Sequence, residues 1–547
     1  MAISLNPFSG GFNAIILIRI QSFARASRYM LRLIMFMYHF ISIHVHPFWI
    51  QFFYFIIIDL LGSLLLMVLK PTDPDFSPRY VDMFFLSTSA LTVSGLSTVA
   101  MERLSSSQIV VFSLLMLVGG EVFVSMLCVF CRSAKPSVAE LTVNRVNSVR
   151  IELETIDSVS TVERIESGTD ISVKDFLRRG SLKYLGLVIV AYWVFFHVTG
   201  FIVCLVYLFT ISSSKEVLRG KGINLGLFAF STTVSSFANG GLIATNENMA
   251  IFVKNSGLLL FQIVLVLAGN TLFPVFLRGT IWVIKCFTKN EELDCTIKSP
   301  KDIKFDHLLT NLGTFFRSIT VLGMIAFVTT LFCAMDWRHP VFSGLNSYQK
   351  IVAALFMGVN ARHAGENSVD PSLISPAVLL FIIFMMYLPS SATFLPLYTS
   401  ERDFLLESRF PFLKEDEEER SVEPKENSRG ITIITKILLL PQVVCVIIFV
   451  IVACIIERRR LQLDPLNFSA LNVIFEVVSA FGNVGISTGY ACSRLQKLHP
   501  DMSCVDQPYS FAGWWSDGGK LLIAFVMLYG RLKKFSEKNG KAWTLKG

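Results

Sequence analysis

Residues 81–97 read VDMFFLSTSALTVSGLS, an apolar stretch of about three helical turns that leads into a polar strand containing Gly95. A helix of this length is too short to cross a hydrocarbon core of about 30 Å, which takes about 20 residues. The same design recurs three times, with half-length stretches at Leu225–Phe237, Ile351–Val359 and Leu471–Phe481 and glycines at Gly241, Gly365 and Gly485. The chain is therefore predicted to contain a fourfold internal repeat.

Longer apolar segments lie on both sides of each half-length stretch. Eight are predicted to cross a membrane: Trp49–Leu69, Gln108–Cys131, Leu182–Ile211, Ser256–Ile284, Ser318–Met335, Ser372–Ser400, Ile437–Ile456 and Trp515–Phe535. Apolar residues make up 53% of the 547 and charged residues only 16%, against roughly 25% in soluble domains. The sequence thus predicts an all-α polytopic membrane protein, with eight transmembrane helices around a central pore and four re-entrant P-loops.

The composition excludes a soluble enzyme, a disordered scaffold and a nucleic-acid-binding module, because the net charge of +8 is scattered over short loops. No nucleic-acid partner is expected. Residues 485–489, GISTG, match the serine-hydrolase pattern G-x-S-x-G, but an apolar half-helix precedes them where a strand is required, and only His499 follows. We therefore expect no enzyme activity, and no cofactor other than transported ions. A multi-spanning receptor or membrane enzyme remains a remote alternative, but it has no need of four re-entrant loops.

Charge in the loops predicts the topology. Basic residues gather on the side of the N-terminus, which places both termini in the cytoplasm by the positive-inside rule, although Arg458–Arg460 lie on the predicted outer side. No removable signal peptide is expected. The predicted organisation comprises a cytoplasmic N-terminus (1–47), pore repeats at 48–131, 181–286, 311–400 and 431–535, cytoplasmic linkers at 132–180, 287–310 and 401–430, the last of them acidic, and a cytoplasmic C-terminus (536–547).

The glycine strands predict the chemistry. Non-helical backbone at membrane depth is tolerated only where it is buried or lines a water-filled path. Four such strands can present backbone carbonyls to a dehydrated cation, and glycine leaves the axis open because it has no side chain. We expect Gly95, Gly241, Gly365 and Gly485 to form a K⁺ or Na⁺ filter. The flanking ion path is predicted to be formed by Val93, Ser94, Asn239, Gly240, His363, Ala364, Asn483 and Val484.

These segments also carry a resemblance. The stretches SALTVSGLST (89–98), FANGGL (237–242) with TNEN (245–248), NARHAGE (360–366) and FEVVSAFGNVG (475–485) resemble the four pore loops of the plant HKT cation transporters. The match includes GGE at 119–121, MYLP at 386–389 and Gly530-Arg531. The resemblance implies membership of the Trk/Ktr/HKT superfamily, four fused potassium-channel-like units, a plasma-membrane location and a homodimer in which each protomer has its own pore.

The resemblance also implies a subtype. In this family the first filter position is serine in Na⁺-selective members and glycine in members that also pass K⁺. If Leu96 aligns with the bulky residue that follows the filter, Gly95 takes this position, which implies a K⁺-permeable Na⁺/K⁺ symporter or channel-like transporter. A slip of one residue would instead place Ser94 there and give a Na⁺-selective uniporter, so both alternatives stay open.

Intramembrane charges and a proline give candidate gate residues. Lys520 and Arg531 are 11 positions apart and share one helical face, so they either form a cationic barrier in the pore or extend to opposite membrane interfaces. The family resemblance favours Arg531 over Lys520. Pro389, with Ser390 and Ser391, is predicted to break or kink the sixth span, as a gate or as a mere kink.

Several other polar residues lie in or near the predicted membrane segments, and their roles can be functional or structural. Arg362 and Glu366 flank Gly365 and can pair with each other. Asp59 and Glu121 lie inside spans one and two, where a carboxylate is either functional or paired across helices. Cys492 and Cys504 flank a polar loop, and they are either bridged, if the loop faces an oxidising compartment, or free.

Overall fold

The computed structural model describes residues 47–74, 76–133, 162–288, 305, 307–388 and 442–536. The chain divides into two units, Met1–Tyr54 with Trp543–Gly547 and Phe55–Ala542. Within the first unit, residues 47–54 form helical turns in which the Trp49 ring packs against the rings of Phe52 and Phe53. The four repeats lie in the second unit, apart from residues 47–54, which are the first turns of the helix that begins the first repeat.

The described residues form α-helices and short 3-10 helices, and no strand occurs among them. The first repeat contains α2 (Pro47–Val68), α3 (Tyr80–Leu91), α4 (Ser106–Gly119) and α5 (Glu121–Ser133). The second contains α7 (Val162–Thr210), α8 (Ser212–Gly220), α9 (Leu225–Ala238), α10 (Ser256–Gly269) and α11 (Phe273–Phe287). The third contains α14 (Asn311–Asp336), α15 (Ser347–His363) and α16 (Pro376–Tyr387). The fourth contains α19 (Gln442–Ile456), α20 (Arg458–Leu463), α21 (Ala470–Gly482), α22 (Cys492–Leu498) and α23 (Asp517–Ser536).

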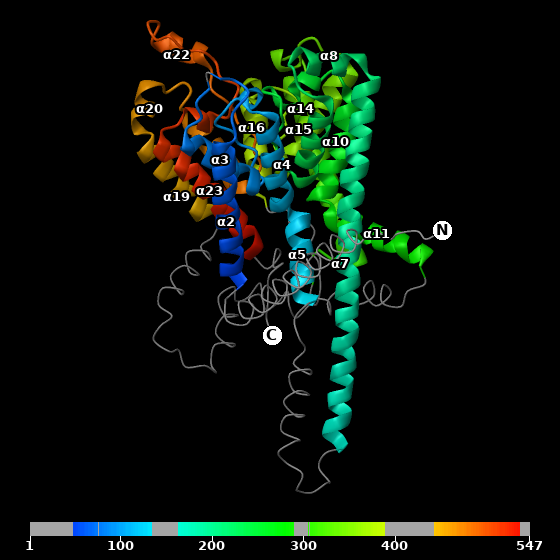
Figure 1. Cartoon of the computed structure of the whole chain (residues 1–547). Coiled ribbons are helices and arrows are strands. Elements are labelled where there is room, and N and C mark those ends of the chain that lie inside the picture. The colour runs from blue at the N-terminus through cyan, green and yellow to red at the C-terminus, as the bar shows by residue number, and fades with distance from the viewer. Residues whose placement is uncertain are drawn as a thin grey trace, which may run out of the picture. The chain divides into compact units, whose positions relative to one another are not determined.

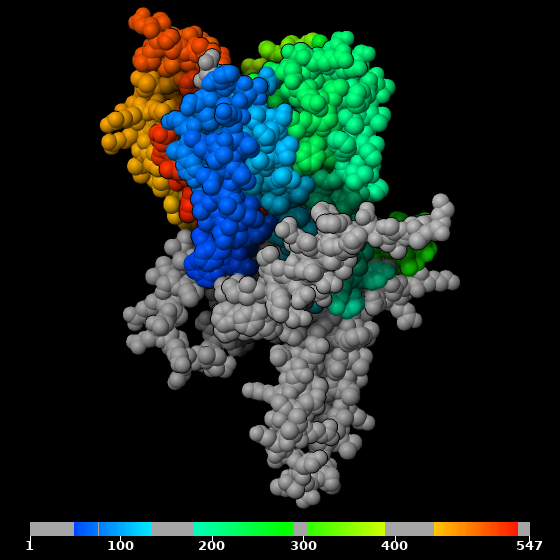
Figure 2. Space-filling view, in the orientation of Figure 1, coloured from blue at the N-terminus to red at the C-terminus, as the bar shows by residue number. Residues whose placement is uncertain are grey.

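The repeats surround a common centre. In Figure 1, α8, α20 and α22 lie at one end, and α5 and the first part of α7 extend from the other. Figure 2 shows the first repeat, in blue, between the fourth, in orange and red, and the second, in green. The half-length helices α3, α9, α15 and α21 have most of their residues buried, and we call them the pore helices. The predicted fold class, an all-α membrane protein, is confirmed.

Three predicted spans are single long apolar helices: residues 49–68, 180–210 and 311–336. The second and fourth predicted spans are each broken, because α4 and α5 meet at 52° and α10 and α11 at 86°. Of the sixth span, the structure describes α16, which has 12 residues. Pro389, Ser390 and Ser391 lie outside the described residues, as do the acidic linker and both predicted termini.

The breaks follow glycines that touch the pore helices. Gly119 ends α4 and Gly269 ends α10, and a Cβ on either would overlap the carbonyl oxygen of Leu91 or Phe237 in the same repeat. Gly530 of α23 meets the Phe481 carbonyl in the same way. Because glycine has no Cβ, it lets two backbones approach this closely, and it is also a weak helix former. The second helix of three repeats therefore supports the last turn of its own pore helix.

Candidate functional site

Three of the four pore helices end where a residue other than glycine takes a left-handed conformation. Val93, Asn239 and Asn483 have φ of 51°, 62° and 49°, and the third repeat has no such residue at His363. Asparagine adopts this region more readily than other side chains, whereas it is unusual for β-branched valine. A left-handed residue stops the helix and turns the chain back. The non-helical segments that follow carry the predicted filter residues, and we call them strands although no β-sheet forms among the described residues.

The four glycines Gly95, Gly241, Gly365 and Gly485 meet one another. All four have positive φ, of 74°, 66°, 69° and 100°. A Cβ on Gly95 would lie 2.9 Å from Gly485 Cα and 3.2 Å from Gly241 Cα, and one on Gly365 would lie 2.9 Å from Gly485 Cα. One on Gly241 would lie 3.4 Å from Gly365 Cα. The strands of the four repeats thus converge in a closed ring, which we call the glycine ring.

The carbonyls beside the ring follow one cyclic order. The carbonyl oxygen of Gly240 lies 3.1 Å from a Cβ built on Gly95, and that of Ser94 lies 2.6 Å from one built on Gly485. Ala364 O lies 2.7 Å from a Cβ built on Gly241, and Val484 O contacts the Cβ position of Gly365. Each strand therefore presents the carbonyl that precedes its glycine to the glycine of the neighbouring strand. A side chain at any of the four glycines would collide with backbone.

Ser94 does not replace Gly95 in this ring. Its hydroxyl is buried, 2.8 Å from Thr92 Oγ1, and accepts a hydrogen bond of 2.8 Å from Asn483 Nδ2. The same amide donates to the carbonyl of Met527 in α23. The hydroxyl thus joins the first strand to the start of the fourth, and Gly95 is the residue with the close contacts to Gly241 and Gly485.

A cavity of about 500 Å³ opens from the ring and is lined by Gly95 and Gly241; we call it the vestibule. Its lining includes the carboxylates Glu247, Asp370 and Asp506. The four pore helices end a few residues before the glycines of the same ring, and helix C-termini carry about half a negative charge each. Both features favour a cation in the ring.

One lysine joins two repeats beside the vestibule. Lys221 Nζ donates to Glu102 Oε1 at 2.5 Å and to Glu247 Oε1 at 3.0 Å. Burial lowers the pKa of Lys221, but the hydrogen bonds to both carboxylates outweigh it and raise the pKa above its usual value. Glu102 Oε1 also accepts from Asn246 N at 3.1 Å. The first and second repeats are therefore fastened by a charged cluster.

The candidate gate residues of α23 have different surroundings. Lys520 is buried and forms an ion pair of 2.7 Å with Asp82 of α3, so its charge is balanced. Arg531 is 1% exposed and donates a hydrogen bond to the carbonyl of Gly119, where α4 breaks. It follows Gly530, which contacts the last turn of α21. Arg531 thus lies near the last turns of the first and fourth pore helices and satisfies a carbonyl freed by the helix break.

The other carboxylates are held by neighbouring elements. Asp59 accepts a hydrogen bond of 2.7 Å from Thr88 of α3, which favours the structural reading of this residue. Glu121 Oε1 lies 3.9 Å from His307 Nε2. Glu366 accepts from Ser236 Oγ of α9 at 2.8 Å, and Arg362 Nη1 lies 3.0 Å from the Met324 sulfur. Glu366 therefore joins the third strand to the second pore helix.

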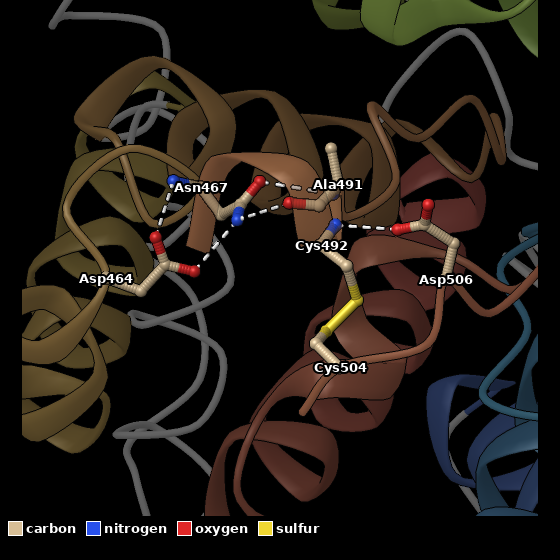
Figure 3. The surroundings of a disulfide bond; sticks show 6 residues. All are labelled: Asp464, Asn467, Ala491, Cys492, Cys504 and Asp506. Atoms are coloured by element: carbon tan, nitrogen blue, oxygen red, sulfur yellow. Dashed lines mark hydrogen bonds between the residues drawn. A yellow bond between two sulfur atoms is a disulfide. The ribbon is translucent and has the colours of Figure 1, made fainter. Parts of the chain in front are cut away.

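Cys492 and Cys504 form a disulfide with a Cα–Cα distance of 5.5 Å, which confirms the bridged alternative (Figure 3). Asp506 Oδ1 accepts from Cys492 N at 2.6 Å. On the other side, the Asn467 amide bonds to both the N–H and the carbonyl of Ala491. The loop that follows the fourth strand is thus closed at its base.

Sequence reasoning missed three residues: Asp82 pairs with the gate candidate Lys520, Ser510 bonds to Ser97 just after Gly95, and Glu476 bonds to Ser487 just after Gly485. Asp82 and Lys520 lie 438 positions apart, and Ser97 and Ser510 lie 413 apart, so no local motif marks these pairs. The one available signal was the rarity of buried carboxylates in a membrane protein.

The fold and this site define a helical membrane protein built around an axial ring of backbone carbonyls. The family model described as "Cation transport protein" matches residues 166–537. The chain is 42% identical over 517 residues to "Cation transporter HKT2;4" of Oryza sativa subsp. japonica, covering 94% of this chain and 97% of that protein. It is 38% identical over 486 residues to "Sodium transporter HKT1" of Arabidopsis thaliana, covering 87% and 91%. Among solved structures, the potassium transporter TrkH from Vibrio parahaemolyticus aligns at a TM-score of 0.47 and 15% identity, covering 89% and 83%.

The chain belongs to the plant HKT family of cation transporters. It is therefore a membrane cation transporter and not an enzyme, as the sequence predicted.

Proposed function

We propose that this chain transports K⁺ as well as Na⁺ across the plasma membrane, as a Na⁺/K⁺ symporter or a channel-like transporter. Its selectivity filter is the glycine ring of Gly95, Gly241, Gly365 and Gly485. The observation that carries the proposal is the cyclic contact in which each glycine meets the carbonyl of the neighbouring strand. Backbone carbonyls in a ring replace the hydration shell of a monovalent cation.

The K⁺-permeable subtype rests on Gly95. A serine at this position would bring a side chain within about 3 Å of two neighbouring strands, since even a Cβ would lie 2.9 Å from Gly485 Cα. A narrower ring favours the smaller Na⁺ over K⁺. The alternative, a Na⁺-selective uniporter with Ser94 as the first filter residue, is less well supported because the Ser94 hydroxyl is engaged by Thr92 and Asn483.

The route of the ion is proposed as follows. Cations collect in the vestibule, lose water at the ring, and pass Arg531, which lies beneath it and limits conduction as a fixed positive charge. Lys520 contributes less because Asp82 balances it. Pro389, Ser390 and Ser391 form the gate below the ring.

The proposal also covers topology and assembly. The vestibule faces outward, and both termini are cytoplasmic. The repeats keep the predicted boundaries, and two chains form a homodimer.

The test is the reversal potential of the expressed protein while external Na⁺ and K⁺ are varied separately. We expect the wild type to follow both ions. Gly95→Ser is expected to reduce the ratio of K⁺ to Na⁺ permeability by about tenfold or more, equivalent to ~1.4 kcal/mol. Gly344→Ser is the matched control, because Gly344 also has positive φ, 73°, yet no atom lies within 4 Å of its Cβ position.

The outcomes separate the alternatives. A wild type that ignores K⁺ would support the Na⁺-selective uniporter. Equal effects of Gly95→Ser and Gly344→Ser would mean that the ring does not select. Absence of current in protein that reaches the surface would contradict transport through this ring altogether.

A further inference from the structure

Residues 510–512, which directly precede or begin the last short 3-10 helix, touch the strands of both the first and the fourth repeat. Ser510 N donates a hydrogen bond of 2.9 Å to Ser97 O, and Ser97 N donates one of 2.9 Å to Ser510 Oγ. The two residues are 413 positions apart. Ser97 follows Gly95 by two positions, so this reciprocal pair holds the first strand just beyond the glycine ring.

The next two residues of the loop hold the fourth strand. Phe511 N donates to Ser487 Oγ at 2.8 Å, and Ala512 N donates to Glu476 Oε1 at 2.8 Å. Ser487 Oγ in turn donates to Glu476 Oε2 at 2.7 Å. Ser487 follows Gly485 by two positions, as Ser97 follows Gly95. Residues 510–512, which we call the staple, therefore join two strands at the same register.

Glu476 is suited to this position by its two acceptor oxygens. Its side chain comes from the pore helix α21 and is fully buried. The Ser487 hydroxyl donates to it and also accepts from Phe511 N and from Gly489 N, so both of its lone pairs are in use. A glutamine would direct its NH₂ either at the N–H of Ala512 or at this saturated hydroxyl. One bond of the staple would then be lost.

The approach to the staple is anchored as well. The chain runs from Ala491 through the disulfide-closed loop to Asp506, whose carboxylate accepts from Cys492 N at 2.6 Å (Figure 3). The two ends of this loop, Cys492 and Asp506, are thus tied to each other four residues before the chain reaches Ser510.

We propose that the staple sets the separation of Gly95 and Gly485 and thereby the ion selectivity of the ring, with Ser510 and Glu476 as positioning residues. These two glycines are in very close contact, since a Cβ on Gly485 would lie 2.6 Å from Gly95 Cα. A small outward movement of either strand widens the ring between them. This inference rests on the proposed filter function, because it assigns the staple to that same ring.

The experiment measures reversal potentials in Na⁺ and K⁺ mixtures for Ser510→Ala and Glu476→Gln in the full-length protein. We expect the K⁺ to Na⁺ permeability ratio to shift by about fivefold in each, the factor equivalent to one ordinary hydrogen bond. Ser510→Thr keeps the hydroxyl at a partly exposed position and is expected to restore the wild-type ratio. Ser343→Ala and Glu216→Gln, both exposed, are the matched controls.

A reversal potential does not depend on the number of transporters at the surface, so poorly expressed variants are also scored. Wild-type ratios in both Ser510→Ala and Glu476→Gln would overturn the staple proposal. A shift in Ser510→Thr equal to that in Ser510→Ala would overturn it too, since the hydroxyl would then be irrelevant. Gly95→Ser in the same assay separates the two ideas: if it leaves the ratio unchanged, the filter assignment fails, and if it alone changes the ratio, the staple fails.

Discussion

Gly119→Ala tests whether the second span supports the first pore helix. Gly119 ends α4, and a Cβ there would overlap the carbonyl oxygen of Leu91, the last residue of α3. Backbone cannot rotate aside as a side chain can, so the cost lies at the upper end of the overpacking range, about 3 kcal/mol. Alanine returns ~1 kcal/mol of helix propensity, which leaves a net loss of about 2 kcal/mol.

Gly323→Ala is the matched control, because Gly323 lies inside α14 with no atom within 4 Å of its Cβ position. It is expected to gain ~1 kcal/mol, so the two identical substitutions should differ by about 3 kcal/mol. Thermal unfolding of the detergent-purified protein measures this difference. Because Leu91 lies four residues before Gly95, we also expect the current to fall in Gly119→Ala and not in Gly323→Ala. Equal melting temperatures and equal currents in the two variants would refute the reasoning.

Three further outcomes are expected. Cys492→Ser with Cys504→Ser should lower the free energy of unfolding by about 3 kcal/mol and make the melting temperature insensitive to reductant, whereas an unchanged melting temperature would contradict a stabilising bridge. Asp82→Asn should cost about 3–5 kcal/mol by leaving Lys520 buried without its partner, and adding Lys520→Met should recover most of it in the same melting assay. Lys221→Met should raise current from the vestibule side at low ionic strength and not at high salt; equal effects at both would exclude an electrostatic cause.

Local features of the sequence were enough to predict the pore helices and the strands that follow them. A half-length apolar stretch is too short to cross the bilayer, and its fourfold repetition before a glycine indicates a re-entrant segment. The positive φ of Gly95 and Gly485 is a conformation that glycine adopts readily. The sequence could not decide between Ser94 and Gly95, because that choice depends on which residue faces the other three strands. The structure brings Gly95 against Gly241 and Gly485, and whether this ring selects ions stays a prediction.

Features that depend on distant contacts were missed or mispredicted. The second and fourth spans look continuous in sequence because long apolar runs lie on both sides of Gly120 and Asn270. The breaks arise where Gly119 and Gly269 meet pore-helix carbonyls, which is a property of the packed repeats. Likewise, Lys520 and Arg531 share a helical face, but their partners, Asp82 and the Gly119 carbonyl, belong to the first repeat.

The third repeat breaks the fourfold pattern three residues before the proposed gate at Pro389. In the other repeats a glycine of the second helix meets a pore-helix carbonyl, whereas here Gly482 of the fourth pore helix meets the Met386 carbonyl, 2.6 Å from its Cβ position. The two backbones approach as closely as in the other repeats. Here, however, the pore helix α21 supplies the glycine and α16 supplies the carbonyl, so the contact joins the third and fourth repeats. Gly482 directly precedes Asn483, which is left-handed and leads to Gly485. Because α16 touches the fourth filter strand at its origin, displacement of the sixth span would be transmitted to the ring through Gly482, and a glycine is required there for the same reason as at Gly119.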